Sequence, residues 1–82
     1  MNYEIKYSAK ALKQLGKLDR QTQTQVLKRI EKLSENPFLA KPLSNRLKNN
    51  FSERVGKIRI IFSISGNEMD IAKIGHRKSV YG

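Results

Sequence analysis

The sequence predicts an α+β domain of two layers, in which a pair of helices packs on one face of a small, mostly antiparallel sheet. Alternating and helical segments follow one another in the order β-α-α-β-β-β, and tight turns join the last three segments. Alternation is typical of half-buried strands, whereas apolar residues three or four apart are typical of helices. The chain has 82 residues, so we expect a single domain over residues 1–82 with one core.

The first half of the chain contains one expected strand and two expected helices. Residues 2–7 alternate between apolar and polar side chains and predict the strand. Ser8 and Asp19 provide side-chain oxygens that cap a short helix and a longer one. The second helix is expected to end at Asn36, because the residue before Pro37 avoids the helical conformation. The short connection between the helices predicts an antiparallel hairpin.

The stretch from residue 38 to residue 50 is the least regular part of the sequence. It contains the turn-forming residues Pro42, Ser44, Asn45, Asn49 and Asn50. It also carries Lys41, Arg46 and Lys48. We therefore expect a basic loop between the helices and the last three strands.

Two tight turns set the expected register of those strands. Gly56-Lys57 and Gly66-Asn67 are both typical of two-residue hairpin turns. With the first turn in place, Arg54 pairs with Arg59 on one face of the sheet. The expected core face holds Val55, Ile58, Ile60, Phe62, Ile64, Met69 and Ile71. The expected opposite face holds Ser52, Arg54, Arg59, Ile61, Ala72, Ile74 and His76.

The two paired arginines are the first candidate functional feature. Like charges directly opposite each other are unfavourable in a sheet, unless an anion lies between them. Arg77 and Lys78 follow the last strand, so four cations and His76 are expected at one edge of the sheet. The alternative is that the arginines reach water in different directions and that His76 is only a polar spacer.

Net charge indicates the class of partner. Seventeen Lys and Arg against seven Asp and Glu give a formal charge of +10. A strongly basic surface attracts polyanions, and phosphate contacts supply most non-specific affinity for nucleic acid. A basic surface kept for solubility, or matched to an acidic protein, remains an alternative.

Composition argues against several other classes of function. The chain has no cysteine and one histidine, which argues against a conventional zinc site, and it shows no carboxylate cluster for magnesium. We expect no cofactor and no metal. No apolar run is long enough to span a membrane, and residues 1–4 lack the order of a secretory signal. A cytoplasmic protein is the expectation.

Three segments together resemble the RelE/ParE toxin superfamily. Residues 54–59 (RVGKIR) and 74–81 (IGHRKSVY) resemble the superfamily's hairpin and its ending. Residues 7–15 (YSAKALKQL) resemble its opening strand and helix, and Leu43 and Leu47 fit its loop. The resemblance spans nearly the whole chain and implies the RelE-like fold.

The resemblance implies the toxin of a type II toxin–antitoxin system. RelE-type members are ribosome-dependent endoribonucleases (mRNA interferases), which cut messenger RNA in the ribosomal A site and stop translation. They use the 2′-hydroxyl of the RNA as nucleophile, leave a 2′,3′-cyclic phosphate and need no metal ion. The implied partners are the ribosome, messenger RNA and a RelB-like antitoxin.

Site residues are carried over position by position. Arg59 matches the arginine that stabilises the transition state, and Arg77 matches the one that binds phosphate and assists the leaving group. Tyr81 matches a tyrosine that orients or stacks on a base. Ser52 and Arg54 stand where the best-known RelE enzymes carry two lysines; Arg54 keeps a phosphate contact but is a poor base. His76 is the substitute base that we consider, because its ordinary pKa suits proton transfer at neutral pH. Further RNA contacts are expected from Lys41, Arg46, Lys48, Lys57 and Lys78.

Two other functions remain open at this point. ParE-type members of the superfamily share the fold but poison DNA gyrase through protein contact. A non-catalytic module that binds RNA or an acidic protein is the other. The presence of Arg59, Arg77 and Tyr81 together favours the ribonuclease.

Overall fold

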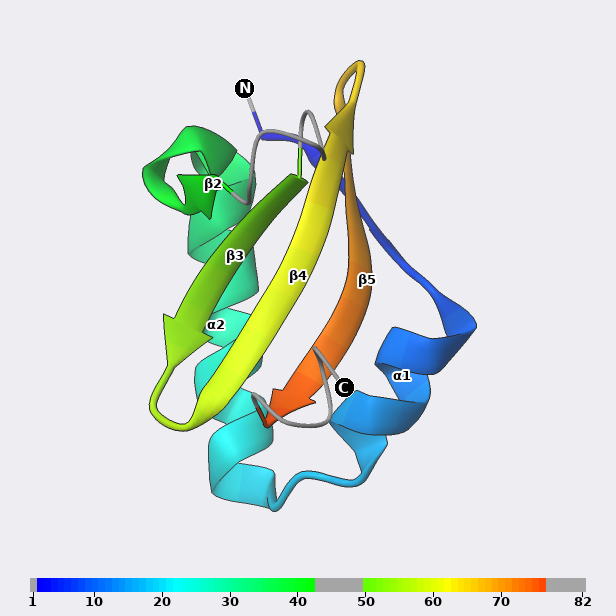
Figure 1. The fold of residues 1–82 in the computed structure, drawn as a ribbon, viewed down its shortest axis with the longest axis vertical. Helices are drawn as coiled ribbons and strands as arrows, with labels where there is room; N and C mark the ends of the chain where they lie inside the picture. The colour runs from blue at the N-terminus through cyan, green and yellow to red at the C-terminus, as the bar shows by residue number, and fades with distance from the viewer. Residues whose placement is uncertain (1, 43–49, 77–82) are drawn as a thin grey trace.

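The computed structural model describes residues 2–42 and 50–76 and confirms the α+β class. Two helices pack on a mixed sheet, in the expected order along the chain (Figure 1). The elements are β1 (Glu4–Tyr7), α1 (Ala9–Gly16), α2 (Arg20–Glu35), the 3-10 helix η1 (Pro37–Leu39), β2 (Lys41–Pro42), β3 (Asn50–Val55), β4 (Ile58–Ser65) and β5 (Glu68–His76).

The described strands form one five-stranded sheet in the order β1-β5-β4-β3-β2. β1 runs parallel to β5, and the other neighbours are antiparallel, as expected of a mostly antiparallel sheet. In Figure 1, α2 runs behind β3 and β4, while α1 lies beside β5. One face of the sheet is thus covered by helices. We call the other the outer face.

Both helices begin where the sequence predicts. Ser8 caps α1 by accepting a hydrogen bond from the backbone N–H of Ala11, and Asp19 caps α2 by accepting one from Thr22. These caps satisfy N–H groups that have no partner within the helix. α2 ends at Glu35, directly before the Asn36-Pro37 pair.

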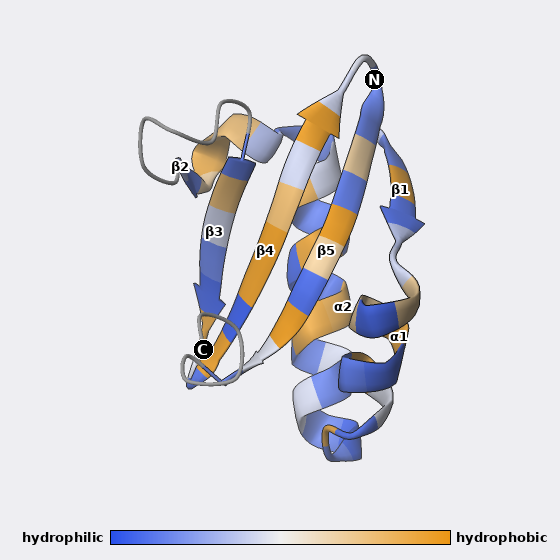
Figure 2. Cartoon of the chain, turned by 45° about the vertical axis from the view of Figure 1, so that its right-hand side comes forward, coloured by the Kyte–Doolittle hydropathy of each residue, from blue (hydrophilic) through white to orange (hydrophobic). Residues whose placement is uncertain are grey.

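The core lies between the helices and the sheet. Alternate residues of β4 and β5 point into it, and Figure 2 shows the resulting change between hydrophobic and hydrophilic segments along both strands. Phe62 and Ile60 of β4 are fully buried, as are Val26 and Ile30 of α2. Burial of such side chains supplies the main driving force for folding.

Two segments before β3 differ from the expectation. The first strand begins at Glu4 rather than residue 2, because the N–H of Tyr3 donates to the Ser34 carbonyl of α2 (2.7 Å) instead of to a strand. The stretch expected as a loop contains η1 and the short edge strand β2, in which Lys41 pairs with Ser52. Turn-forming residues hid both elements, since each is only two or three residues long.

Candidate nucleic-acid interface

The hairpin of β3 and β4 places Arg54 and Arg59 directly opposite each other, as predicted. Their neighbours Val55 and Ile58 are buried in the core, so the two arginines lie on the outer face. Gly56 makes this turn with φ of 62°, a conformation that glycine adopts without strain. We call Arg54 and Arg59 the arginine pair.

No carboxylate neutralises the arginine pair within residues 2–42 and 50–76. Arg54 Nε donates to the Gly56 carbonyl (2.9 Å), and Arg59 Nη1 donates to Ser52 Oγ (3.4 Å). The nearest acid in sequence, Glu53, points to the helix side, where it binds Arg29 (2.6 Å). Two permanent positive charges therefore lie side by side on the outer face, an arrangement that a bound anion would relieve.

A hollow of about 240 Å³ lies at the arginine pair. Arg54, Gly56, Lys57 and Arg59 line it. Guanidinium groups suit phosphate oxygens because their planar donors form paired hydrogen bonds. The hollow therefore has the size and charge to receive a phosphate group.

Two further lysines extend the positive charge across the outer face. Lys41 pairs with Ser52, and Lys73 pairs with Ile61, on the same face as the arginine pair. Lys41 is exposed, as its predicted role requires. Sequence reasoning missed Lys73, because simple alternation along the last strand placed it in the core.

An extra residue in β5 explains why Lys73 was missed. Phe62 pairs with Ile71 but Ile61 pairs with Lys73, so Ala72 has no partner on β4. Such a β-bulge exchanges the two faces for every residue that follows it. The sequence did contain a sign of the bulge. Strict alternation along β5 would bury the charge of Lys73, which is costly, and would expose Ile74.

The bulge corrects the placement of Ile74 and His76. Both were expected on the face of the arginine pair, but Ile74 is fully buried in the core and His76 pairs with Ile58 on the helix side. Gly75 is the β5 residue that lies opposite Arg59. The geometric reason for treating His76 as the base is therefore removed.

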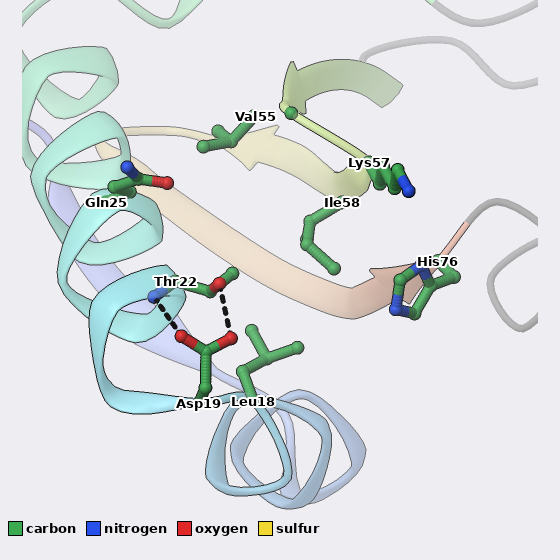
Figure 3. Close-up of a pocket in the computed structure, with 9 residues that line it drawn as sticks. Leu18, Asp19, Thr22, Gln25, Val55, Lys57, Ile58 and His76 are labelled. Atoms are coloured by element: carbon green, nitrogen blue, oxygen red, sulfur yellow. Dashed lines mark hydrogen bonds between the residues drawn. The ribbon is translucent and has the colours of Figure 1, made fainter.

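His76 instead borders a second hollow of about 240 Å³, on the helix side of the hairpin. Figure 3 shows His76 beside Ile58, with Leu18 and the start of α2 across the hollow. Hydrogen bonds from the side chain and backbone of Thr22 lower the pKa of Asp19 there. The carboxylate therefore remains charged as the cap of α2.

Five of the predicted site residues lie outside the described part of the chain. They are Arg46, Lys48, Arg77, Lys78 and Tyr81. The predicted residues that the structure describes are Arg54, Arg59, Lys41, Lys57 and His76. Of these, Lys57 lies in the turn and borders both hollows, and His76 lies on the helix side.

Residues 2–42 and 50–76 contain neither a metal-ligating cluster nor a membrane-spanning helix. No group of three or more His, Cys, Asp or Glu side chains lies close enough there to hold a metal ion. None of the helices in these ranges is long and apolar enough to cross a membrane.

Solved structures define the fold class as that of the RelE toxins. A chain of the toxin–antitoxin complex RelBE2 from Mycobacterium tuberculosis is 27% identical, with a TM-score of 0.82, and the match covers 94% of this chain and 100% of that one. A free mutant form of Escherichia coli RelE matches with a TM-score of 0.84 at 16% identity, over 99% and 90% of the two chains. YoeB from Staphylococcus aureus matches with a TM-score of 0.78 at 16% identity, over 94% and 99%.

The family follows from the sequence itself. Residues 5–81 match the family model described as the ParE toxin of type II toxin–antitoxin systems, parDE. The chain belongs to this family within the RelE/ParE superfamily and is the toxin of a type II toxin–antitoxin system. No curated protein matches the chain.

Proposed function

We propose that this toxin is a ribosome-dependent endoribonuclease that cuts messenger RNA in the A site without a metal ion. The observation that carries the proposal is the arginine pair, which lines a phosphate-sized hollow and has no carboxylate partner in the described ranges. ParE-type members of the superfamily poison gyrase by protein contact and do not need such a site. With this activity the protein would act in the cytoplasm, where the ribosomes are.

The reaction needs charge stabilisation more than it needs a cofactor. The 2′-oxygen of the RNA attacks the neighbouring phosphorus, the bond from phosphorus to the 5′-oxygen breaks, and a 2′,3′-cyclic phosphate remains. The 2′-hydroxyl loses a proton and the leaving 5′-oxygen gains one. The intermediate carries extra negative charge on the phosphate oxygens, and fixed cations stabilise that charge. Arg54 and Arg59 are suited to this role because they stay protonated throughout.

Residues outside the described ranges complete the proposed site. From the resemblance, Arg77 binds the phosphate and assists the leaving group, and Tyr81 orients a base of the substrate. The lysines Lys41, Lys57 and Lys78, together with Arg46 and Lys48, contact the RNA backbone. Such contacts add affinity without reading sequence.

An antitoxin is the proposed protein partner. The Mycobacterium tuberculosis relative and an archaeal RelE from Methanococcus jannaschii, 21% identical with a TM-score of 0.77, are both described in complex with an antitoxin. A basic outer face suits an acidic, extended polypeptide that orders on binding. Neutralisation would follow if such a chain covered the arginine pair.

A translation extract tests the proposed reaction. We expect the wild-type toxin to cut messenger RNA at the A-site codon and to leave a 5′-hydroxyl on the downstream fragment. The R54Q/R59Q variant should cut at least about 100-fold more slowly, the loss typical of removing fixed transition-state donors. The K28Q/K32Q variant is the matched control, because it removes the same charge from exposed positions of α2.

The same proteins tested on DNA gyrase separate the second candidate function. The match to the ParE family model favours gyrase poisoning as that candidate. Trapped gyrase–DNA breaks with intact messenger RNA would contradict the ribonuclease and support the ParE-type activity. If the protein neither cuts messenger RNA nor traps gyrase–DNA breaks, the remaining candidate is a non-catalytic binding module.

A further inference from the structure

α1 holds the backbone of β5 where the bulge lies. β1 ends at Tyr7, so beyond Ile71 no strand of the described residues pairs with this edge of β5. Two polar side chains take the place of a strand, one from Ser8, the cap of α1, and one from Gln14 within α1. Ser8 Oγ donates to the Ala72 carbonyl (2.8 Å), and Gln14 Oε1 accepts from the Ile74 N–H (2.8 Å).

The hydrogen bonds of Ser8 fit only a bulged strand. Its backbone N–H donates to the Ile71 carbonyl (2.9 Å), while its hydroxyl donates to the next carbonyl, that of Ala72. In a regular strand consecutive carbonyls point to opposite edges. Two successive carbonyls turned to one edge are a direct consequence of the extra residue.

The bulge decides which side chain lies beside Arg59. Without it, pairing would continue from Phe62 and Ile71 and would set Ile74 opposite Arg59. With it, Gly75 lies there instead, and Ile74 is fully buried. A glycine has no side chain to occupy the outer face next to the guanidinium. The bulge therefore keeps the bulky side chain of Ile74 away from Arg59 on the outer face.

We infer that Gln14 is a positioning residue for the site on the outer face, although it lies on α1 and does not contact the substrate. By accepting from Ile74 it holds the register that sets Gly75 against Arg59. The effect of Gln14 on catalysis rests on the proposed ribonuclease activity. Ser8 contributes to the same bulge, but it also caps α1, so Gln14 is the cleaner residue to change.

Three variants test this role. Q14L removes the acceptor at similar size, and Q14E keeps an oxygen that accepts from Ile74. Q23L is the matched control, because Gln23 Nε2 makes one part-buried hydrogen bond to the Leu15 carbonyl (2.9 Å), away from β5. Q14L and Q23L therefore each lose one hydrogen bond between a side chain and the backbone, and only Q14L loses it at the bulge.

Register and catalysis are then measured separately. NMR contacts between the backbones of Arg59 and Gly75 report the register, and amide exchange of Ile74 reports its hydrogen bond. We expect Q14L to weaken the NMR contacts, to exchange Ile74 faster and to cut RNA about 10- to 100-fold more slowly at saturating substrate, with KM changed by a few-fold at most. Q14E should restore both readouts, and Q23L should keep both.

The outcomes separate this inference from the proposed function. The role of Gln14 would be overturned if Q14L kept the contacts of Arg59 with Gly75, or if it lost no more activity than Q23L. A wild-type protein that cuts no RNA would contradict the proposed ribonuclease. In that case the NMR contacts alone still decide whether Gln14 sets the register.

Discussion

The two faces of the sheet come from the same strands, yet they are held together by different means. On the helix side, alternate residues of β4 and β5 are buried against α2, and the acid Glu53 is paired with Arg29. On the outer face, the arginine pair has no carboxylate within the described ranges to balance it. Apolar burial on the first face provides the stability that lets the second face carry uncompensated charge.

The largest expected effect lies on the helix side. Phe62 is fully buried, and its neighbour Ser63 lies on the outer face. F62A should lower the free energy of unfolding by about 3–5 kcal/mol, because it leaves a cavity in the core. S63A should change it by about 0.5 kcal/mol or less. Urea denaturation measures both, and equal losses would break the distinction between the faces.

The next effect belongs to the outer face. R59Q should weaken binding of single-stranded RNA about tenfold, or about 1.4 kcal/mol. It should also make the dependence of log affinity on log salt shallower by about 0.7, the value expected when the protein neutralises one phosphate fewer. R20Q removes the same charge from an exposed position at the start of α2 and should keep the wild-type salt dependence. An identical slope for R59Q would show that Arg59 touches no phosphate.

A smaller effect concerns the cap of α2 and depends on pH. The pKa of Asp19 is lowered from 3.8 by hydrogen bonds from the side chain and backbone of Thr22, so folding favours the charged form. The stabilisation is therefore complete above pH 3.8 and disappears as the pH falls through the lower folded pKa. Thermal melts of D19N, which keeps a good cap residue, should fall less steeply in acid than those of wild type.

A control on an exposed carboxylate of the same helix completes that experiment. E31Q removes one carboxylate without touching the cap. Its melts should follow the acid dependence of the wild type. If E31Q flattened the curve as much as D19N, the effect would come from net charge rather than from the cap.

The smallest expected effect is that of H76Q. His76 lies on the helix side beside Ile58, away from the arginine pair, so the cleavage rate at saturating substrate should stay near that of wild type. A rate that falls sharply while RNA binding is kept would restore His76 as the general base and would show that the two faces act together in the reaction.

Most of the fold could be predicted because its signals are local. Helix caps at Ser8 and Asp19, and the turn at Gly56, each depend on residues within a few positions. The pairing of Arg54 with Arg59 follows directly from that turn. The arginine pair was thus accessible from sequence alone.

The bulge at Ala72 was not accessible in the same way. Its hydrogen bonds come from Ser8 and Gln14, which are about 60 residues away along the chain. Periodicity along a strand does not reveal a residue that is skipped, and one skipped residue moved Ile74 and His76 to the face opposite the one expected. The strand pattern alone therefore misplaced part of the candidate site.

The parallel pairing of β1 with β5 has a consequence for folding during synthesis on the ribosome. The first strand to leave the ribosome pairs with the last, and the bond from Ser8 to Ala72 spans a sequence separation of 64. Such distant contacts form late, because the whole intervening chain must first be made and closed into a loop. The hairpin of the arginine pair can form as soon as β4 emerges, but Gly75 joins it only when synthesis is nearly over. The nascent chain therefore lacks the completed site until synthesis is nearly finished.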